Sequence, residues 1–283
     1  DKVLQLKTIL SDASTVRFHA ISAKTFHKKR KLNTLEGKLY SGIHDQLNDV
    51  KAQAEIRSKF PKPEIHRRNT GYALDALLDN SAFNKENEQP FNMCKLLSGS
   101  EGTLAFTTEI TLQLDELPPK HGVMVAAHFE SITACLEAVV PAMQHKLYAC
   151  EMMDKVILDC TLNNREQQKN RFFIEGDPAA ILMLEVRSNT LDDARKQALE
   201  LIATIDNSGL SYAYPTLEGS QINQALELRK AGLGLLGNIV GDRKAVACIE
   251  DTAVALEDLA PYINEFSALM ADFKQDAVYY AHA

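Results

Sequence analysis

Alternating apolar and polar positions predict strands at both ends of the first 114 residues. Residues 3–10 fit such a strand, and so does the stretch LAFTTEITLQL at 104–114. Most apolar residues of the second stretch share one parity, beginning with Leu104 and Phe106, which predicts a strand with one buried face. Between these strands, a polar helical region covers about 25–60 and is broken by FPKP.

The pattern of apolar and polar positions changes after DELPPK at 115–120, a stretch with the composition of a linker. A helical region without clear periodicity is expected from about 147 to 173. The remaining pattern predicts strands at 121–129, 179–188, 210–217, 244–254 and 277–283, and helices at 131–146, 189–206, 220–233 and 256–273. This β-α-β rhythm predicts a ferredoxin-like antiparallel sheet with helices on one face, in a chain of the α+β class with domains at 1–116 and 117–283.

Composition narrows the class of protein. With 283 residues, 45% of them hydrophobic, the chain can bury two cores, and its net charge of −7 argues against a nucleic-acid binder. No apolar run approaches the roughly 20 residues of a membrane helix, and no secretory leader opens the chain. A cytoplasmic protein is expected, with peripheral membrane contact left open. Because the chain begins and stops inside predicted strands, we expect a piece of a longer protein.

Cysteine usage points to a reducing compartment. The five cysteines are odd in number, scattered, and never spaced as C-x-x-C, so a disulfide framework or a closed zinc site is not expected. They are Cys94, Cys135, Cys150, Cys160 and Cys248.

The stretch SGSEGT at 98–103 is the most unusual local feature. Gly99 and Gly102 allow positive φ and let a ligand approach the main chain, whose successive N–H groups can face an anion or a ring edge. Glu101 between them can cap the turn or accept from a ligand hydroxyl. On spacing alone, an ordinary β-turn is the better interpretation, since short glycine motifs often match by chance.

Two motifs together resemble the FAD-linked 2-hydroxyacid dehydrogenases of the vanillyl-alcohol-oxidase type, in particular large bacterial members with a C-terminal iron–sulfur domain. The segment NTGYAL at 69–74 is followed by GSEGTL at 99–104, where Ala105 and Phe106 depart from the usual family residues. The resemblance implies that 1–116 is the second part of a VAO/PCMH-type FAD-binding domain without its phosphate-loop subdomain. It also implies that 117–283 is a substrate or cap domain truncated at its C-terminus. The residues it assigns to FAD are Asn69, Thr70, Gly71, Gly99, Ser100, Glu101, Gly102, Thr103 and Phe106.

The same resemblance assigns three residues to the substrate. Arg229 would clamp a carboxylate with its guanidinium fork, Lys244 near the start of the next predicted strand would assist, and His282 would be one ligand of a divalent metal that acidifies the hydroxyl. From the residues alone, Arg229 and Lys244 are equally well explained as solvated charges. One histidine does not make a metal site.

The resulting hypothesis is an FAD-dependent oxidoreductase that oxidises a small D-2-hydroxyacid of the D-2-hydroxyglutarate or D-lactate type by hydride transfer to flavin. Zinc, manganese or iron, and an iron–sulfur cluster, are expected cofactors of the longer protein. The electron acceptor is unknown, and a homodimer is left open. The alternative is a non-catalytic ferredoxin-like ligand-binding or assembly module, in which the glycine-rich stretch is only a turn.

Overall fold

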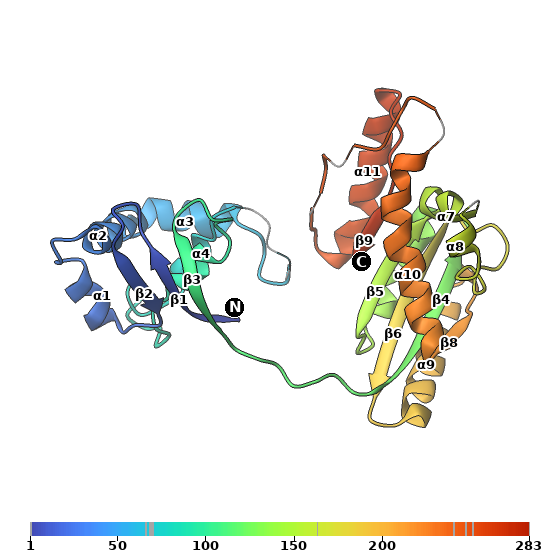
Figure 1. The fold of residues 1–283 in the computed structure, drawn as a ribbon, viewed down its shortest axis with the longest axis horizontal. Helices are drawn as coiled ribbons and strands as arrows, with labels where there is room; N and C mark the ends of the chain where they lie inside the picture. The colour runs from blue at the N-terminus through green and yellow to red at the C-terminus, as the bar shows by residue number, and fades with distance from the viewer. Residues whose placement is uncertain are drawn as a thin grey trace. The chain divides into compact units, whose positions relative to one another are not determined.

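The computed structural model of the chain divides into two compact units, Asp1–Glu116 and Leu117–Ala283 (Figure 1), and each is described by itself. The structure describes residues 2–65, 67, 71–162, 164–239, 241–246, 248–250 and 252–282, without the side chains of Leu233 and Asn238. Both units combine helices with an antiparallel sheet, so the chain is an α+β protein. In this described part, no helix has the length and apolar character needed to cross a membrane.

The N-terminal unit is a three-stranded antiparallel sheet covered by helices. Its strands are β1 (Val3–Ile9), β2 (Thr15–His19) and β3 (Phe106–Leu112), in the order β2-β1-β3. Its helices are α1 (Ala23–Lys29), α2 (Leu35–Leu47), α3 (Val50–Lys59), the 3-10 turn η1 (Asp75–Leu77) and α4 (Cys94–Leu97). The core forms where buried strand residues such as Phe18 meet Phe26, Tyr40 and Phe91 from the covering segments.

The predicted helical region at 25–60 consists of three helices, because the sequence supplies a new N-cap for each. The side chains of Ser22, Thr34 and Asp49 accept from the main-chain N–H groups of Thr25, Gly37 and Lys51. Each cap gives the four unpaired N–H groups of a helix start one acceptor, so the chain can turn between helices without leaving all of those donors unsatisfied.

Strand β3 differs from its prediction in burial. All seven of its residues are exposed, and the side chain of Phe106 is 71% exposed. Among the described strands β3 pairs only with β1, so it is a sheet edge, and a bulge between Lys7 and Thr8 shifts its register. The prediction of a half-buried strand is therefore wrong, although the strand itself is present.

The C-terminal unit is built on a larger antiparallel sheet. Its strands are β4 (His121–Phe129), β5 (Ala149–Asp154), β6 (Ala180–Ser188), β7 (Ser211–Ala213), β8 (Thr216–Glu218) and β9 (Tyr280–His282). They are ordered β7-β4-β6-β5-β9, with β8 pairing on β4 (Figure 1). Strand β9 therefore forms the edge next to β5 and brings the C-terminal residues into the sheet.

Helices cover both faces of this sheet. On one face Val123 and Leu184 pack with Leu201, and on the other Met124 and Met183 belong to a second core. The first face is covered by α5 (Ile132–Glu137), α6 (Val139–Ala142), α9 (Leu191–Asp206) and α11 (Leu259–Asp272), and the second by α7 (Lys155–Leu162) and α10 (Ser220–Leu235). The short helices α8 (Arg165–Gln168), η2 (Leu236–Asn238) and η3 (Leu256–Asp258) lie between these elements in the chain. The prediction of helices on one face is wrong, because β4 and β6 are apolar at both parities.

Two further predictions of secondary structure are wrong. The sequence ACEMMD of β5 falls in the helical region expected from about 147 to 173, but pairing with β6 and β9 makes it a strand. Residues 244–254 were expected to form a strand, yet their described members form neither helix nor strand. Most of these described residues are exposed, so the segment lacks the packing that would hold a strand.

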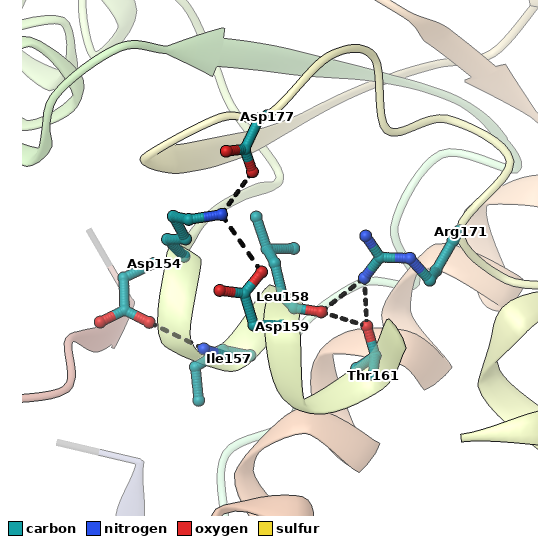
Figure 2. Close-up of polar contacts among 8 residues, drawn as sticks. Asp154, Ile157, Leu158, Asp159, Thr161, Arg171 and Asp177 are labelled. Atoms are coloured by element: carbon teal, nitrogen blue, oxygen red, sulfur yellow. Dashed lines mark hydrogen bonds and ion pairs between the residues drawn. The ribbon is translucent and has the colours of Figure 1, made fainter. Parts of the chain in front are cut away.

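Asp154 and Arg171 hold α7 at its two ends (Figure 2). The carboxylate of Asp154 accepts from the N–H of Ile157 at 3.0 Å. It also accepts from the N–H of Tyr279, just before β9, at 2.8 Å. Nη1 of Arg171 donates to the carbonyl of Leu158 and to Oγ1 of Thr161, each at 2.5 Å. Burial raises the pKa of Asp154 even though main-chain donors stabilise its charged form. This aspartate therefore links β5, α7 and the segment that leads into β9.

His128 fixes a loop against β4. It is completely buried, its Nδ1 lies 2.8 Å from the carbonyl oxygen of Ala126, and its Nε2 accepts from the N–H of Glu175 at 3.1 Å. Both ring nitrogens are used by a neutral imidazole, with Nδ1 as donor and Nε2 as acceptor. Burial holds the pKa of His128 below its ordinary value of 6.5.

We predict that the free energy of unfolding of the C-terminal unit decreases as pH falls below 6.5. The unfolded chain binds a proton at His128 before the folded chain does, so this stability is present above the unfolded pKa and is lost as pH falls. Urea unfolding at several pH values measures the slope. His128→Gln should flatten it, whereas His121→Gln, at an exposed position of the same strand, should leave it unchanged. Equal slopes for the original chain and His128→Gln would contradict the prediction.

Candidate functional site

The glycine-rich stretch forms a tight turn between α4 and β3. The N–H of Thr103 donates to the carbonyl of Ser100 at 2.9 Å, and φ is +50° at Glu101 and +75° at Gly102. Positive φ at both central residues is the pattern of a type I′ turn, which glycine adopts without strain and glutamate does not. The turn is therefore a strained conformation that the surrounding contacts must stabilise.

Two predicted cofactor residues hold this turn through their hydroxyl groups. Oγ of buried Ser100 donates to the carbonyl of Leu97 at 2.8 Å, and Oγ1 of Thr103 donates to the carbonyl of Ser100 at 2.6 Å. The hydroxyl of Tyr72 lies 2.8 Å from Oγ1 of Thr103. The described hydrogen bonds of Ser100 and Thr103 thus shape the loop.

The two motifs of the sequence come together at this turn. A Cβ added to Gly99 would lie 3.6 Å from the carbonyl oxygen of Gly71, so the described part of the first motif packs on the second. Gly71 itself has φ +79°. The predicted residues Asn69 and Thr70 lie outside the described part of the chain.

The turn has donors to offer a cofactor. Within the described residues, the N–H groups of Glu101 and Gly102 have no main-chain acceptor, and a Cβ at Gly102 would meet no atom within 4 Å. Two successive free N–H groups beside open space can face a ring edge or an anion. These residues therefore fit the approach of FAD, and the exposed Phe106 on β3 follows them in the chain.

A second candidate site lies in the C-terminal unit, where three elements bring charged side chains together. Arg229 comes from α10, Glu151 from β5 and His282 from β9, and Glu151 and His282 are direct cross-strand partners. Nη2 of Arg229 lies 2.5 Å from Oε2 of Glu151. Nδ1 of His282 lies 2.8 Å from both oxygens of the same carboxylate. We refer to these three residues as the Arg–Glu–His cluster.

Close packing of two helices seats Arg229. Gly232, one turn further along α10, approaches α7 so closely that a Cβ there would lie 2.4 Å from Cγ2 of Ile157. Only glycine allows this approach, which lowers α10 onto the face of the sheet that carries β5. The guanidinium then reaches the carbonyl of Ala281 at 3.1 Å and stacks on Tyr280, with Cζ 4.0 Å from the ring centroid.

Burial decides what the cluster can do. The side chains of Arg229 and Glu151 are 8% and 13% exposed, whereas that of His282 is 63% exposed. Nε of Arg229 is buried and has no hydrogen-bond partner within the described residues. A buried donor without an acceptor is costly, so this nitrogen is an unsatisfied position of the cluster.

A cavity of about 300 Å³ adjoins the cluster. Glu151 and His282 contribute to its lining together with Met143, Leu147 and Tyr148. Burial raises the pKa of the phenol of Tyr280, which therefore stays neutral beside the cluster. The cavity thus adjoins Glu151 and His282, whereas Arg229 is not among the described residues that line it.

Lys244 stands apart from these residues in the described structure. It lies in an exposed segment and its Nζ donates to the carbonyl of Ile239. No described contact joins it to the Arg–Glu–His cluster. Its predicted position at the start of a strand is wrong, because the described residues of 244–254 form no strand, whereas its role as a second cation remains a prediction.

The described residues do not form a site for the predicted metal. No group of three or more His, Cys, Asp or Glu side chains is placed there to hold a metal ion. His282 provides a single imidazole with one nitrogen facing Glu151. The described residues therefore do not fit a divalent metal, and no chemistry is assigned to one.

Glu151 was not predicted as a functional residue. Its strand was expected to be helical, so nothing indicated that it faces His282. The sequence did contain one signal, a carboxylate between the apolar residues Cys150 and Met152. A carboxylate buried in such a run requires a cationic partner, and Arg229 is that partner.

We predict opposite effects for alanine at two glycines of the N-terminal unit. Gly102→Ala should lower the free energy of unfolding by about 1–2 kcal/mol, because an L-residue is strained at its positive φ. Gly42→Ala, in α2 with no atom within 4 Å of the new Cβ, should raise it by about 0.5–1 kcal/mol. Thermal and urea unfolding of the chain measure both. A Gly102→Ala variant as stable as the original would show that the turn is not held at positive φ.

Relatives of this chain share one name. D-2-hydroxyglutarate dehydrogenase of Pantoea ananatis is 28% identical over 280 residues, which cover 95% of this chain and 26% of that protein. D-2-hydroxyglutarate dehydrogenase of Escherichia coli is 28% identical over 281 residues, with the same two shares. The protein of that name from Haemophilus influenzae is 30% identical over 219 residues, 74% of this chain and 20% of that protein. The chain thus spans about a quarter of the length of its relatives.

A family comparison covers the C-terminal unit. The family described as FAD linked oxidases, C-terminal domain, matches residues 118–283, the part that contains the Arg–Glu–His cluster. The matched range is more than half of the chain. The chain therefore belongs to the FAD-linked oxidase family.

Proposed function

We propose that this chain forms the substrate-binding part, and one cofactor-binding turn, of an FAD-dependent oxidoreductase that oxidises a small D-2-hydroxyacid. The family and the relatives support an FAD-dependent dehydrogenase. The observation that carries the substrate assignment is the buried guanidinium of Arg229, whose Nε has no acceptor within the described residues. An acidic substrate would supply that acceptor.

Arg229 is the carboxylate clamp in this proposal. Stacking on Tyr280 and the hydrogen bond to Ala281 fix the plane of its guanidinium, so the fork is oriented before the substrate binds. Orientation in advance lowers the entropic cost of binding. A carboxylate that reaches the Nε edge forms charge-assisted hydrogen bonds in a site with little water.

His282 is the residue proposed to handle the substrate hydroxyl. Its ring is largely exposed, and the nitrogen that does not face Glu151 is available to accept a proton from that hydroxyl. Lys244, fifteen residues after Arg229, is proposed as a second cation for the carboxylate. These roles are proposals for the full-length protein.

Gly99, Glu101 and Gly102 are proposed to receive the cofactor through their main chain. FAD, when bound, accepts the hydride from the substrate carbon that carries the hydroxyl. The contribution of this chain is to offer free N–H groups and an approach without side-chain atoms. The hydroxyls of Ser100 and Thr103 keep that turn in shape.

The substrate class remains D-2-hydroxyglutarate or D-lactate. The shared name of the relatives favours the dicarboxylic acid. The second carboxylate of such an acid would need its own cation, and the residues that line the cavity include no lysine or arginine. Arg187 stacks on the cavity residue Tyr148, with Cζ 3.7 Å from the ring centroid, and is our candidate for that cation.

We predict that the purified full-length protein is yellow and that a D-2-hydroxyacid bleaches its flavin absorbance without air. Arg229→Lys keeps the charge but loses the planar fork. Its kcat/KM should therefore fall by a factor that corresponds to a loss of about 2–4 kcal/mol of transition-state stabilisation, with flavin content unchanged. Anaerobic stopped-flow absorbance at several substrate concentrations measures this effect.

Arg195→Lys is the matched control, because Arg195 pairs with Glu218 on the exposed surface of the same unit. Its rates should equal those of the unchanged protein. A colourless protein that added FAD does not change would overturn the proposal and favour the non-catalytic module. Equal rates for Arg229→Lys and Arg195→Lys would remove Arg229 from the substrate site.

A further inference from the structure

We propose that Glu151 is a positioning residue, whose carboxylate holds His282 in the tautomer that presents a bare Nε2 outward and holds Arg229 in the orientation that receives a carboxylate. This inference rests on the proposed function and assigns a role to a residue that the motifs leave unassigned. Glu151 does not contact the reacting atoms; it acts through its two neighbours.

The strand register sets the contact between Glu151 and His282. The two residues are opposite each other on β5 and β9, which places their side chains on the same face of the sheet. Asp154, three residues further along β5, binds the main-chain N–H of Tyr279 at 2.8 Å. The approach of β9 to β5 is therefore fixed at two points, and Glu151 meets the imidazole at a defined place.

A carboxylate is an acceptor only, and this decides the protonation of the imidazole. With Nδ1 of neutral His282 at 2.8 Å from both oxygens of Glu151, the favourable arrangement has the proton on Nδ1. Nε2 then carries a lone pair. This is the less common tautomer of a histidine side chain in water, so the contact with Glu151 changes which nitrogen can accept a proton.

The side chains of Glu151 and His282 differ in their exposure to water. The carboxylate lies inside and the imidazole is largely exposed, so Glu151 is shielded from water while Nε2 of His282 faces outward. A carboxylate shielded in this way orients a histidine more firmly than an exposed one, because water competes less for its lone pairs.

Glu151 also prepares Arg229. The carboxylate contacts Nη2, the same nitrogen that donates to Ala281, and leaves the buried Nε without an acceptor in the described residues. Nη2 of the guanidinium is therefore held by the protein, whereas Nε has no acceptor among the described residues. Without Glu151, the arginine would carry an uncompensated charge into a largely buried place.

The test is the tautomer of His282 in the 283-residue chain, read from the nitrogen chemical shifts of ¹⁵N-labelled histidine at a mildly alkaline pH where ordinary imidazoles are neutral. His282→Gln identifies the resonances. We expect the Nδ1–H form in the unchanged chain and a shift toward the Nε2–H form in Glu151→Leu. Glu137→Leu, at an exposed glutamate of the same unit, should leave the shifts unchanged. An Nε2–H form in the unchanged chain, or no shift in Glu151→Leu, would overturn the proposal.

Loss of folding in Glu151→Leu would not block the test. The double variant Glu151→Leu/Arg229→Met removes both buried charges together, and apolar side chains of similar volume often replace such a pair without loss of stability. The tautomer of His282 in that variant should shift in the same way. A folded double variant that keeps the Nδ1–H form would overturn the proposal as well.

Turnover separates this inference from the proposed function. In the full-length protein, Glu151→Leu should lower kcat by about 10- to 100-fold with flavin content unchanged, as expected when a histidine loses its orienting partner. A protein that shows the tautomer shift but oxidises no 2-hydroxyacid would refute the proposed function and keep the positioning role. A protein whose kcat is unaffected by Glu151→Leu would refute the catalytic consequence of that role.

Discussion

The arrangement of the C-terminal unit depends on one largely buried ion pair, between Arg229 and Glu151. Moving both charges out of water is expensive, and their attraction offsets that cost without a large surplus, so such a pair is a weak way to stabilise a fold. The ion pair instead fixes how the elements that carry it are arranged. Because neither charge can remain buried alone, helix α10 and strand β5 must meet in one register, and β9 joins them through His282. We therefore infer that the main role of the ion pair is to align the side chains of the candidate site.

Other contacts of the C-terminal unit also position helix α10 and strand β9. Gly232 lets α10 approach α7, and Asp154 ties the start of α7 to the segment before β9. The described residues of β9 are joined to the rest of the unit by pairing with β5 and by side-chain contacts at Asp154 and Glu151. In the N-terminal unit, a strained turn at Glu101 and Gly102 is held by two hydroxyl groups, which again places ordered polar atoms beside open space.

The sequence predicted those features that local pattern determines. Strands β4 and β6 are long and apolar, and helix α9 carries a clear N-cap at Thr190, so each was expected where it occurs. Arg229, His282 and the glycine-rich turn were singled out through the family resemblance, and their roles stay predictions. Features that depend on partners far along the chain were missed. Strand β5 exists because β6 and β9 flank it, and the exposure of β3 follows from its place at a sheet edge. Glu151 was missed for the same reason, since its importance comes from Arg229 and His282, 78 and 131 residues away.

The most direct test of this account is a double-mutant cycle on the ion pair, measured by urea unfolding of the chain with Glu151→Leu, Arg229→Met and both changes together. Each single change leaves a buried charge without its partner and should cost about 3–5 kcal/mol. The double variant should cost less than either single change, because no unpaired charge remains. Additive losses would contradict the account, since they would show that Arg229 and Glu151 do not depend on each other.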